Sequence, residues 1–78
     1  MSRRPLFQSR PRYASVLDAV TAVLPAEHTL RFIDVHALVE EHLGQTVPKS
    51  SVKNALARNS QGTTPKFVRV ARGLYRRA

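Results

Sequence analysis

The apolar residues of this chain recur at helical spacing, and proline or glycine interrupts the pattern at Pro25, Gly44 and Pro48. Each uninterrupted stretch is therefore long enough for one short helix and no more. A single domain of 78 residues buries only about 60% of the surface that its unfolded chain exposes. Short helices in so small a chain have to share one compact core, which leaves no room for a second lobe.

The first two stretches predict helices over residues 13 to 24 and 35 to 43. Asp34 suits the N-cap of the second helix, because its carboxylate can accept a hydrogen bond from the first turn. Gly44 suits the C-terminal end, where the backbone often turns left-handed. Residues 28 to 32 alternate weakly between apolar and polar side chains and are too few for a helix, so we expect a small strand there. The expected core-facing residues are Tyr13, Val16, Leu17, Val20, Val23, Leu24, Val35, Leu38, Val39 and Leu43.

A third helix is predicted over residues 48 to 58, and its exposed face is polar and positive. Proline suits the first helical position, since the amide proton that it lacks would have no partner there. The inward positions are Val52, Ala55, Leu56 and Asn59. The outward positions are Lys49, Ser50, Lys53, Asn54, Ala57 and Arg58. Residues 60 to 65 include a glycine and two threonines, and this composition predicts a loop.

The chain ends in a predicted β-hairpin over residues 66 to 77, with its turn at Arg72–Gly73. Glycine supplies the positive φ that a tight hairpin turn needs. The expected cross-strand pairs are Ala71 with Leu74, Val70 with Tyr75, and Arg69 with Arg76. Side chains alternate along a strand, so both members of a pair lie on the same face of the sheet. The core face should hold Val68, Val70 and Tyr75, and the other face Arg69 and Arg76.

Charge is sorted along the sequence, which matters more than the formal net charge of +8. Residues 13 to 48 contain all five acids but only one base, Arg31. The segment from Lys49 to the end is rich in lysine and arginine and has no acid. Such segregation predicts a positive face and an acidic face on the folded domain, as in proteins that bind polyanions. A charged surface that is merely solvated is the weaker interpretation, because solubility alone requires no sorting.

Residues 1 to 12 predict a flexible basic arm that precedes a domain of residues 13 to 78. The arm has two prolines, four arginines and few apolar side chains. Its end, Ser9 to Arg12, is similar to arginine–proline arms that enter the minor groove of A·T-rich DNA, which would make Arg10 and Arg12 DNA contacts. The alternative is a tail that adds only nonspecific attraction to a polyanion.

The order helix, strand, helix, turn, helix and basic hairpin is typical of a winged helix-turn-helix domain. Two stretches carry a closer resemblance, residues 51 to 56 (SVKNAL) and residues 67 to 76 (FVRVARGLYR). They resemble HARE-type helix-turn-helix modules and the small winged helices attached to some restriction enzymes. The resemblance spans about residues 13 to 77 and implies an α+β fold, a three-helix winged helix-turn-helix with a C-terminal β-hairpin wing. The wings of these modules often end in an apolar residue where this chain has Arg77, so we expect a short last strand.

The third helix is the expected reading element, because an α-helix fits the major groove of B-DNA. We expect Ser50, Lys53 and Asn54 to contact bases, since asparagine suits adenine, lysine suits guanine and serine suits either. Lys49 and Arg58 lie nearer the helix ends, and we expect them on phosphates.

The hairpin wing is the second expected contact. Arg72 stands beside Gly73 at the turn, where it can lie on phosphate or enter a minor groove. The flanking cations are Lys66, Arg69 and Arg76. Backbone contacts of this kind position a protein on DNA and make its affinity fall steeply with salt.

Catalytic and metal chemistry have little support in the sequence. The chain has no cysteine, and His28, His36 and His42 are eight and six residues apart, which does not place two ligands on one helical turn. The sequence has no glycine-rich phosphate loop, and no histidine–carboxylate pair is predicted near its serines. We therefore expect a protein that is not an enzyme and that needs no metal or cofactor. Nor does any stretch approach the roughly 20 apolar residues that cross a bilayer, so we expect no membrane role.

The sequence thus predicts a noncatalytic protein that binds double-stranded DNA, as a small transcriptional regulator, an architectural factor or the targeting part of a larger system. Without cysteine or a signal peptide, we expect it in the cytoplasm and on the nucleoid. Arginine far outnumbers lysine, a composition that suggests a high-GC bacterium or its phage. A homodimer or larger assembly on DNA stays open. The alternative is a winged-helix module for protein or RNA. The polar, basic character of the expected surface disfavours a protein partner but not RNA. Against RNA stands only the aromatic count, because single-strand readers stack bases on exposed rings and we expect Phe67 and Tyr75 to be needed for packing.

Overall fold

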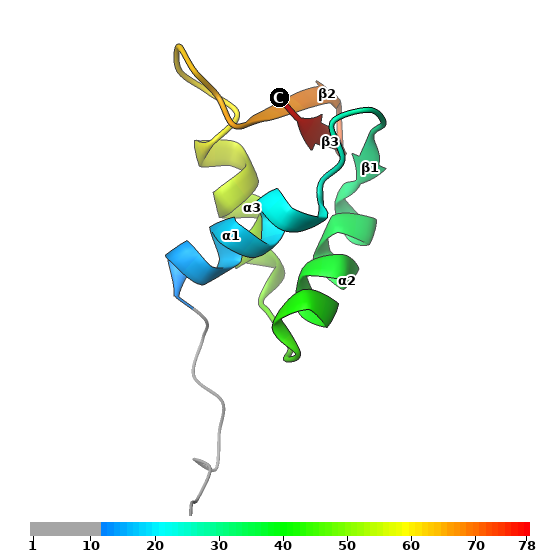
Figure 1. The fold of residues 1–78 in the computed structure, drawn as a ribbon, viewed down its shortest axis with the longest axis vertical. Coiled ribbons are helices and arrows are strands. Elements are labelled where there is room, and N and C mark those ends of the chain that lie inside the picture. Colours follow the sequence, from blue (N-terminus) through cyan, green and yellow to red (C-terminus); the bar gives the residue numbers. More distant parts are fainter. Residues whose placement is uncertain (1–11) are drawn as a thin grey trace, which may run out of the picture.

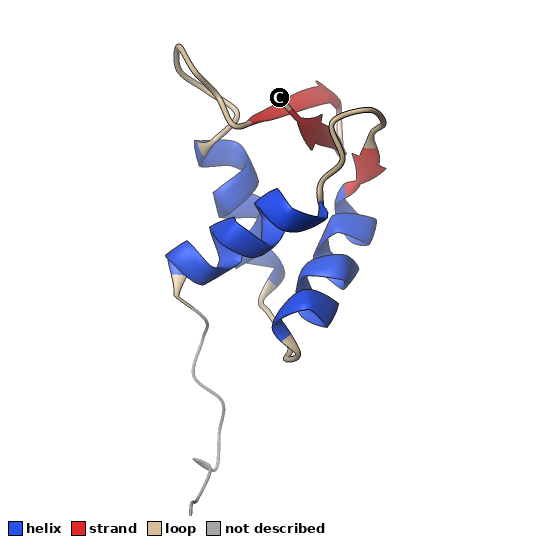
Figure 2. Cartoon of the chain, in the orientation of Figure 1, coloured by secondary structure: helices blue, strands red, loops and turns tan. Residues whose placement is uncertain are grey.

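The computed structural model describes residues 12 to 78, which form an α+β fold of three helices and a three-stranded antiparallel sheet (Figure 1). The helices are α1 (Tyr13–Val23), α2 (Phe32–Leu43) and α3 (Lys49–Arg58), and the strands are β1 (Leu30–Arg31), β2 (Phe67–Ala71) and β3 (Leu74–Arg77). The strand order is β1-β3-β2, so the sheet joins the segment between α1 and α2 to the C-terminal hairpin. Figure 2 shows the helices gathered together and the small sheet at one end of them. Apart from Arg12, the predicted basic arm lies outside the described residues.

The core is apolar throughout and draws on all three helices and on β2. Its members are Val16, Ala19, Val20, Leu24, Val35, Val39, Val47, Val52, Ala55, Leu56 and Phe67, and no polar or charged side chain within residues 12 to 78 is buried. Most of these positions follow the predicted inward faces of the helices. Tyr13 does not, because its side chain stays 40% exposed. The helical pattern therefore predicted most of the core residues that the helices contribute, but it wrongly placed Tyr13 among them.

The start of α2 differs from the sequence prediction. The helix begins at Phe32 rather than Val35, and Arg31 takes the N-cap position that was expected of Asp34. The reason is the sheet, because β1 ends at Arg31 and the Phe32 N–H then donates to the carbonyl of Gly73 at 2.8 Å. Asp34 lies in the first turn of the helix instead, where a carboxylate interacts favourably with the helix dipole.

The turn between α2 and α3 agrees closely with the prediction. Gly44 ends α2 with a left-handed φ of 70°, a conformation that costs glycine little because it has no Cβ. The helix α3 begins at Lys49, and Pro48 is its N-cap. Pro48 was predicted as the first helical residue, so the helix begins one residue later than predicted. Gly44 thus ends α2, and Pro48 marks the start of α3 a few residues later.

The hairpin turn is confirmed at Arg72–Gly73, where Gly73 has a φ of 74°. Ala71 lies opposite Leu74, as predicted. The last strand is not cut short, since β3 reaches Arg77, whose N–H donates to the carbonyl of Pro25 at 2.9 Å.

Beyond the turn, the predicted register of the hairpin is wrong by one residue. Tyr75 lies opposite Arg69 rather than Val70, and Arg76 lies opposite Val68 rather than Arg69. An irregularity of the β-bulge type between Arg69 and Ala71 causes the shift, since a bulge sets two residues of one strand against one of the other. A slip of one residue moves each side chain to the opposite face of the sheet.

The bulge decides which side chain of β2 enters the core. Phe67 is fully buried, whereas Val70 is 51% exposed. The cross-strand pairing puts Arg69 on the same face as Tyr75, and Arg76 on the opposite face with Val68. The predicted pairing of Arg69 with Arg76 on one face is therefore incorrect.

Phe67→Ala is expected to destabilise the fold by about 3–5 kcal/mol, because it removes a large ring from the core and leaves a cavity. Val70→Ala is the control on the same strand, and its half-exposed side chain should make the change cost about 0.5 kcal/mol or less. Urea denaturation followed by circular dichroism measures both free energies of unfolding. An equal loss of stability at the two positions would contradict the burial of Phe67 and the exposure of Val70 that the bulge produces.

Candidate nucleic-acid interface

The outward face of α3 is as predicted. The helix buries Val52, Ala55 and Leu56 completely, and this fixes the opposite face toward solvent. All six residues predicted to face outward are exposed, namely Lys49, Ser50, Lys53, Asn54, Ala57 and Arg58. This face is polar and positive along its whole length.

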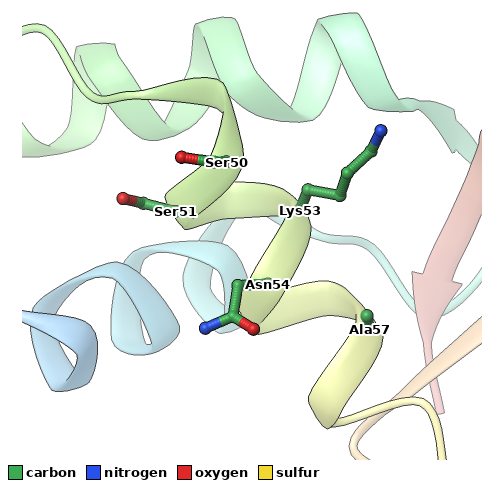
Figure 3. Close-up of a pocket in the computed structure, with 5 residues that line it drawn as sticks. All are labelled: Ser50, Ser51, Lys53, Asn54 and Ala57. Atoms are coloured by element: carbon green, nitrogen blue, oxygen red, sulfur yellow. The ribbon is translucent and has the colours of Figure 1, made fainter.

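Three predicted base contacts lie together in a shallow depression along α3 (Figure 3). They are Ser50, Lys53 and Asn54, and the depression is completed by Ser51 and Ala57, which the sequence had not marked as site residues. Lys53 extends in the direction of α2, and Asn54 extends away from it. The methyl group of Ala57 adds a small apolar spot of the kind that contacts a thymine methyl in a major groove.

Lys53 rests on an aromatic ring. Its Nζ lies 5.9 Å from the centroid of the Phe32 ring, which in turn stacks on His36 with 6.3 Å between centroids. A cation over the face of an aromatic ring is attracted by the ring quadrupole. Phe32 therefore restricts where Lys53 points, a role that the sequence did not reveal because it placed Phe32 before the helix.

Arg58 rests on a ring in the same way, at the C-terminal end of α3. Its Cζ lies 5.1 Å from the centroid of Tyr13, and the Tyr13 hydroxyl accepts a hydrogen bond from Asn59 Nδ2 at 2.8 Å. Tyr13 thus serves as a platform for Arg58 instead of filling the core. Arg12 is exposed and directly precedes Tyr13, so two predicted phosphate or groove contacts lie near the first turn of α1. Arg10 lies outside the described residues.

The hairpin presents its cations on two faces. Arg72 is exposed at the turn beside Gly73. The bulge separates Arg69 from Arg76, and Arg76 is half-buried, with one guanidinium nitrogen donating to the carbonyl of Arg77 at 3.2 Å. The last predicted hairpin contact, Lys66, is exposed where β2 is about to begin. The hairpin is therefore cationic, but its cations lie on both faces of the sheet and not in a single row.

Arg31 adds a further cation beside the hairpin, although in the sequence it belongs to the acidic segment of residues 13 to 48. Arg31 lies opposite Leu74 in the sheet, which brings it beside the hairpin turn. Its Nε lies 3.1 Å from a carboxylate oxygen of Asp34, in an exposed ion pair. Within residues 12 to 78 it is the only lysine or arginine in an ion pair. The cations of α3 and of the hairpin thus have no acidic partner in the described structure.

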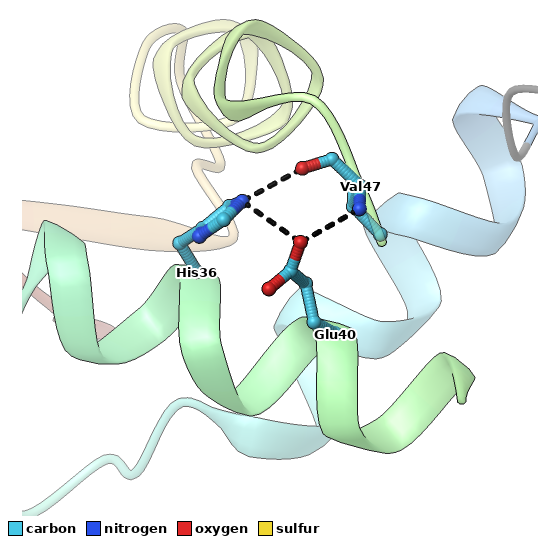
Figure 4. A network of polar contacts seen from close by, with 3 residues as sticks. All are labelled: His36, Glu40 and Val47. Carbon is cyan, nitrogen blue, oxygen red and sulfur yellow. Dashed lines mark hydrogen bonds and ion pairs between the residues drawn. The ribbon is translucent and has the colours of Figure 1, made fainter. Parts of the chain in front are cut away.

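A polar clamp holds the turn between α2 and α3 (Figure 4). His36 Nε2 lies 2.7 Å from the carbonyl oxygen of Val47 and 3.5 Å from Glu40 Oε2. The Val47 N–H donates to the same Glu40 oxygen at 2.8 Å. A carbonyl only accepts, so His36 Nε2 carries a proton. Both backbone groups of Val47 are thereby satisfied from α2, which fixes the point from which α3 starts.

Glu40→Ala is expected to lower the free energy of unfolding by about 1–3 kcal/mol, because the Val47 N–H loses its acceptor in a largely buried place. Glu40→Gln retains an oxygen acceptor and should cost less. Glu41→Ala is the matched control, since Glu41 is exposed and should change stability by about 0.5 kcal/mol at most. Urea denaturation of the three variants tests the clamp, and equal losses for Glu40→Ala and Glu41→Ala would show that it does not hold the turn.

Residues 12 to 78 contain no group of three or more histidine, cysteine, aspartate or glutamate side chains placed to hold a metal ion. Among their helices, none has the length and apolar character needed to span a membrane. Comparisons with protein families, with curated proteins and with solved structures find no match.

Proposed function

We propose that the chain is a noncatalytic winged-helix protein that binds double-stranded DNA, with α3 in the major groove and the β2–β3 hairpin on the backbone or in a minor groove. The observation that carries the proposal is the exposed, acid-free face of α3 beside a cationic hairpin. An α-helix fits the major groove, and its outward polar side chains reach base edges there. Such a protein would act as a small transcriptional regulator or an architectural factor on the nucleoid.

The arrangement of elements is compatible with a winged helix-turn-helix. Three helices precede a two-stranded hairpin, and a short strand between α1 and α2 completes the sheet in the order β1-β3-β2. In this interpretation α2, the clamped turn and α3 form the helix-turn-helix, and β2 and β3 form the wing. The clamp at Val47 supports it, because a reading helix has to be held at a fixed angle to the rest of the protein.

Charge favours nucleic acid over a protein partner. The exposed face of α3 carries lysine, arginine, serine and asparagine side chains, and alanine is its one apolar residue. Protein-binding surfaces are expected to expose a contiguous apolar patch, whereas phosphate contacts require cations that are not already paired with acids. The ion pairs described for residues 12 to 78 involve only residues of β1 and α2.

Two variants test the proposed division of labour between α3 and the hairpin. Lys53→Ala combined with Asn54→Ala should flatten the preference among duplex sequences, since each good base contact discriminates by about 1–3 kcal/mol. Arg72→Ala should weaken binding to all sequences alike and reduce the salt slope of log K by about 1, because it removes a phosphate contact. Fluorescence anisotropy over a panel of labelled duplexes at several salt concentrations measures both effects.

Glu41→Gln is the control for net charge, because it changes the charge by one unit on the exposed side of α2 and should leave affinity nearly unchanged. If the α3 and hairpin variants bind like the wild type, neither element forms the interface. Equal affinity for duplex DNA, single strands and RNA would reduce the protein to a generic polycation. Retention of a specific protein partner at high salt, with no DNA binding, would favour an interaction module.

A further inference from the structure

A small groove lies between the C-terminal end of α3 and the hairpin. It is directly beside the exposed face of α3 that is proposed to contact bases. Its volume is about 250 Å³, and it is lined by Ala57, Ser60, Gln61, Arg69 and Tyr75. Ala57 also lines the depression that contains Ser50, Lys53 and Asn54, so the two hollows meet at this residue. The groove is somewhat smaller than the roughly 300–1,000 Å³ of sites for drug-sized ligands. A ligand of this site would therefore be no larger than a single ring system.

Some polar atoms that line the groove already form hydrogen bonds within the protein, and the remaining atoms define what the groove can bind. Ser60 Oγ donates to the carbonyl of Leu56 at 2.6 Å, and Gln61 Nε2 donates to the carbonyl of Ala57 at 3.1 Å. Ser60 Oγ and Gln61 Oε1 are thus left as acceptors. Arg69 forms no ion pair within residues 12 to 78 and supplies donors. Tyr75 supplies an aromatic ring.

This chemistry disfavours a phosphate group. The groove lies where α3 ends, and the carbonyls at a helix C-terminus carry partial negative charge. The free oxygens of Ser60 and Gln61 would also face the anion. A nucleobase, in contrast, has a flat ring and an edge that carries both donors and acceptors, which aromatic, guanidinium and amide side chains recognise together.

We infer that the groove binds a single nucleobase that is not base-paired, presented by DNA held on the α3 face; this inference rests on the proposed function. The base stacks against Tyr75, while Arg69 donates to its acceptors and Gln61 accepts from its donors. Removing a base from a duplex stack is unfavourable, and least so where the base is already unpaired. The ligand is thus a base in a bulge or an overhang at the edge of the bound duplex.

The bulge in β2 supports this assignment independently. Without it, Arg69 would lie opposite Arg76; with it, Arg69 lies opposite Tyr75 and lines the groove. Bulges often re-aim a side chain next to a functional site. The irregularity thus has a consequence for binding as well as for the core.

The test compares a fully paired duplex with the same duplex carrying one bulged base, using the full chain and fluorescence anisotropy. The wild type should bind the bulged duplex about tenfold more tightly, the contribution of one stacked base. Gln61→Ala should abolish this difference yet leave affinity for the paired duplex within about twofold, because it changes no charge. Arg69→Lys retains the charge but not the planar guanidinium, and it should also abolish the difference. Gln45→Ala, a glutamine in the α2–α3 turn, is the matched control and should keep the difference.

Equal affinity of the wild type for both duplexes would overturn the inference and leave the proposed function intact. A second measurement does not depend on duplex binding: deoxyguanosine and inorganic phosphate are titrated separately into isotope-labelled protein and followed by NMR. The nucleoside should shift the amide signals of Ser60 and Gln61 at millimolar concentration, and phosphate should not. Shifts there with phosphate alone would overturn the base site, and nucleoside shifts without any duplex binding would overturn the proposed function while the site remains.

Discussion

The position of the hairpin relative to α3 depends on Asn59, the residue that follows the last turn of the helix. Its carbonyl accepts from the Lys66 and Phe67 N–H groups at 2.8 and 3.0 Å, which closes the loop of residues 60 to 65. Its side-chain amide donates to the Tyr13 hydroxyl and to the Ala55 carbonyl, both at 2.8 Å. One residue thus ties the end of α3 to the start of α1 and to the start of β2. Since Phe67 enters the core directly after this anchor, the hairpin, the groove and the exposed face of α3 keep a fixed arrangement.

The cations of the candidate interface are partly organised before any ligand arrives. Lys53 and Arg58 rest on Phe32 and Tyr13, and contacts of this kind in exposed places contribute about 0.5–1 kcal/mol each. That is enough to favour one orientation of a long side chain and small enough for a phosphate or a base edge to displace it. Rings on α1 and α2 therefore influence how α3 meets a ligand, although neither ring belongs to the face itself.

Much of the fold follows from local patterns in the sequence. The helical spacing of apolar residues predicted the three helices, Gly44 predicted the end of α2, and Gly73 predicted the hairpin turn, because each of these depends on side chains or dihedral angles within a few residues. The first residue of α2 was missed because it depends on a hydrogen bond from Phe32 to Gly73. The hairpin register was missed because a bulge costs little locally and is selected by the burial of Phe67 against the helices.

The candidate site divides in the same way. The sequence by itself determined the polar, positive face of α3 and the segregation of charge, since a helix that buries Val52, Ala55 and Leu56 has to expose Ser50, Lys53 and Asn54. Only the tertiary structure decided that Arg69 turns toward Tyr75, that Arg31 joins the hairpin, and that Tyr13 and Phe32 support cations of α3. The physical reason is that a helix face is set by its own 3.6-residue repeat. Contacts between elements distant in the sequence are set by which register lets the whole core close.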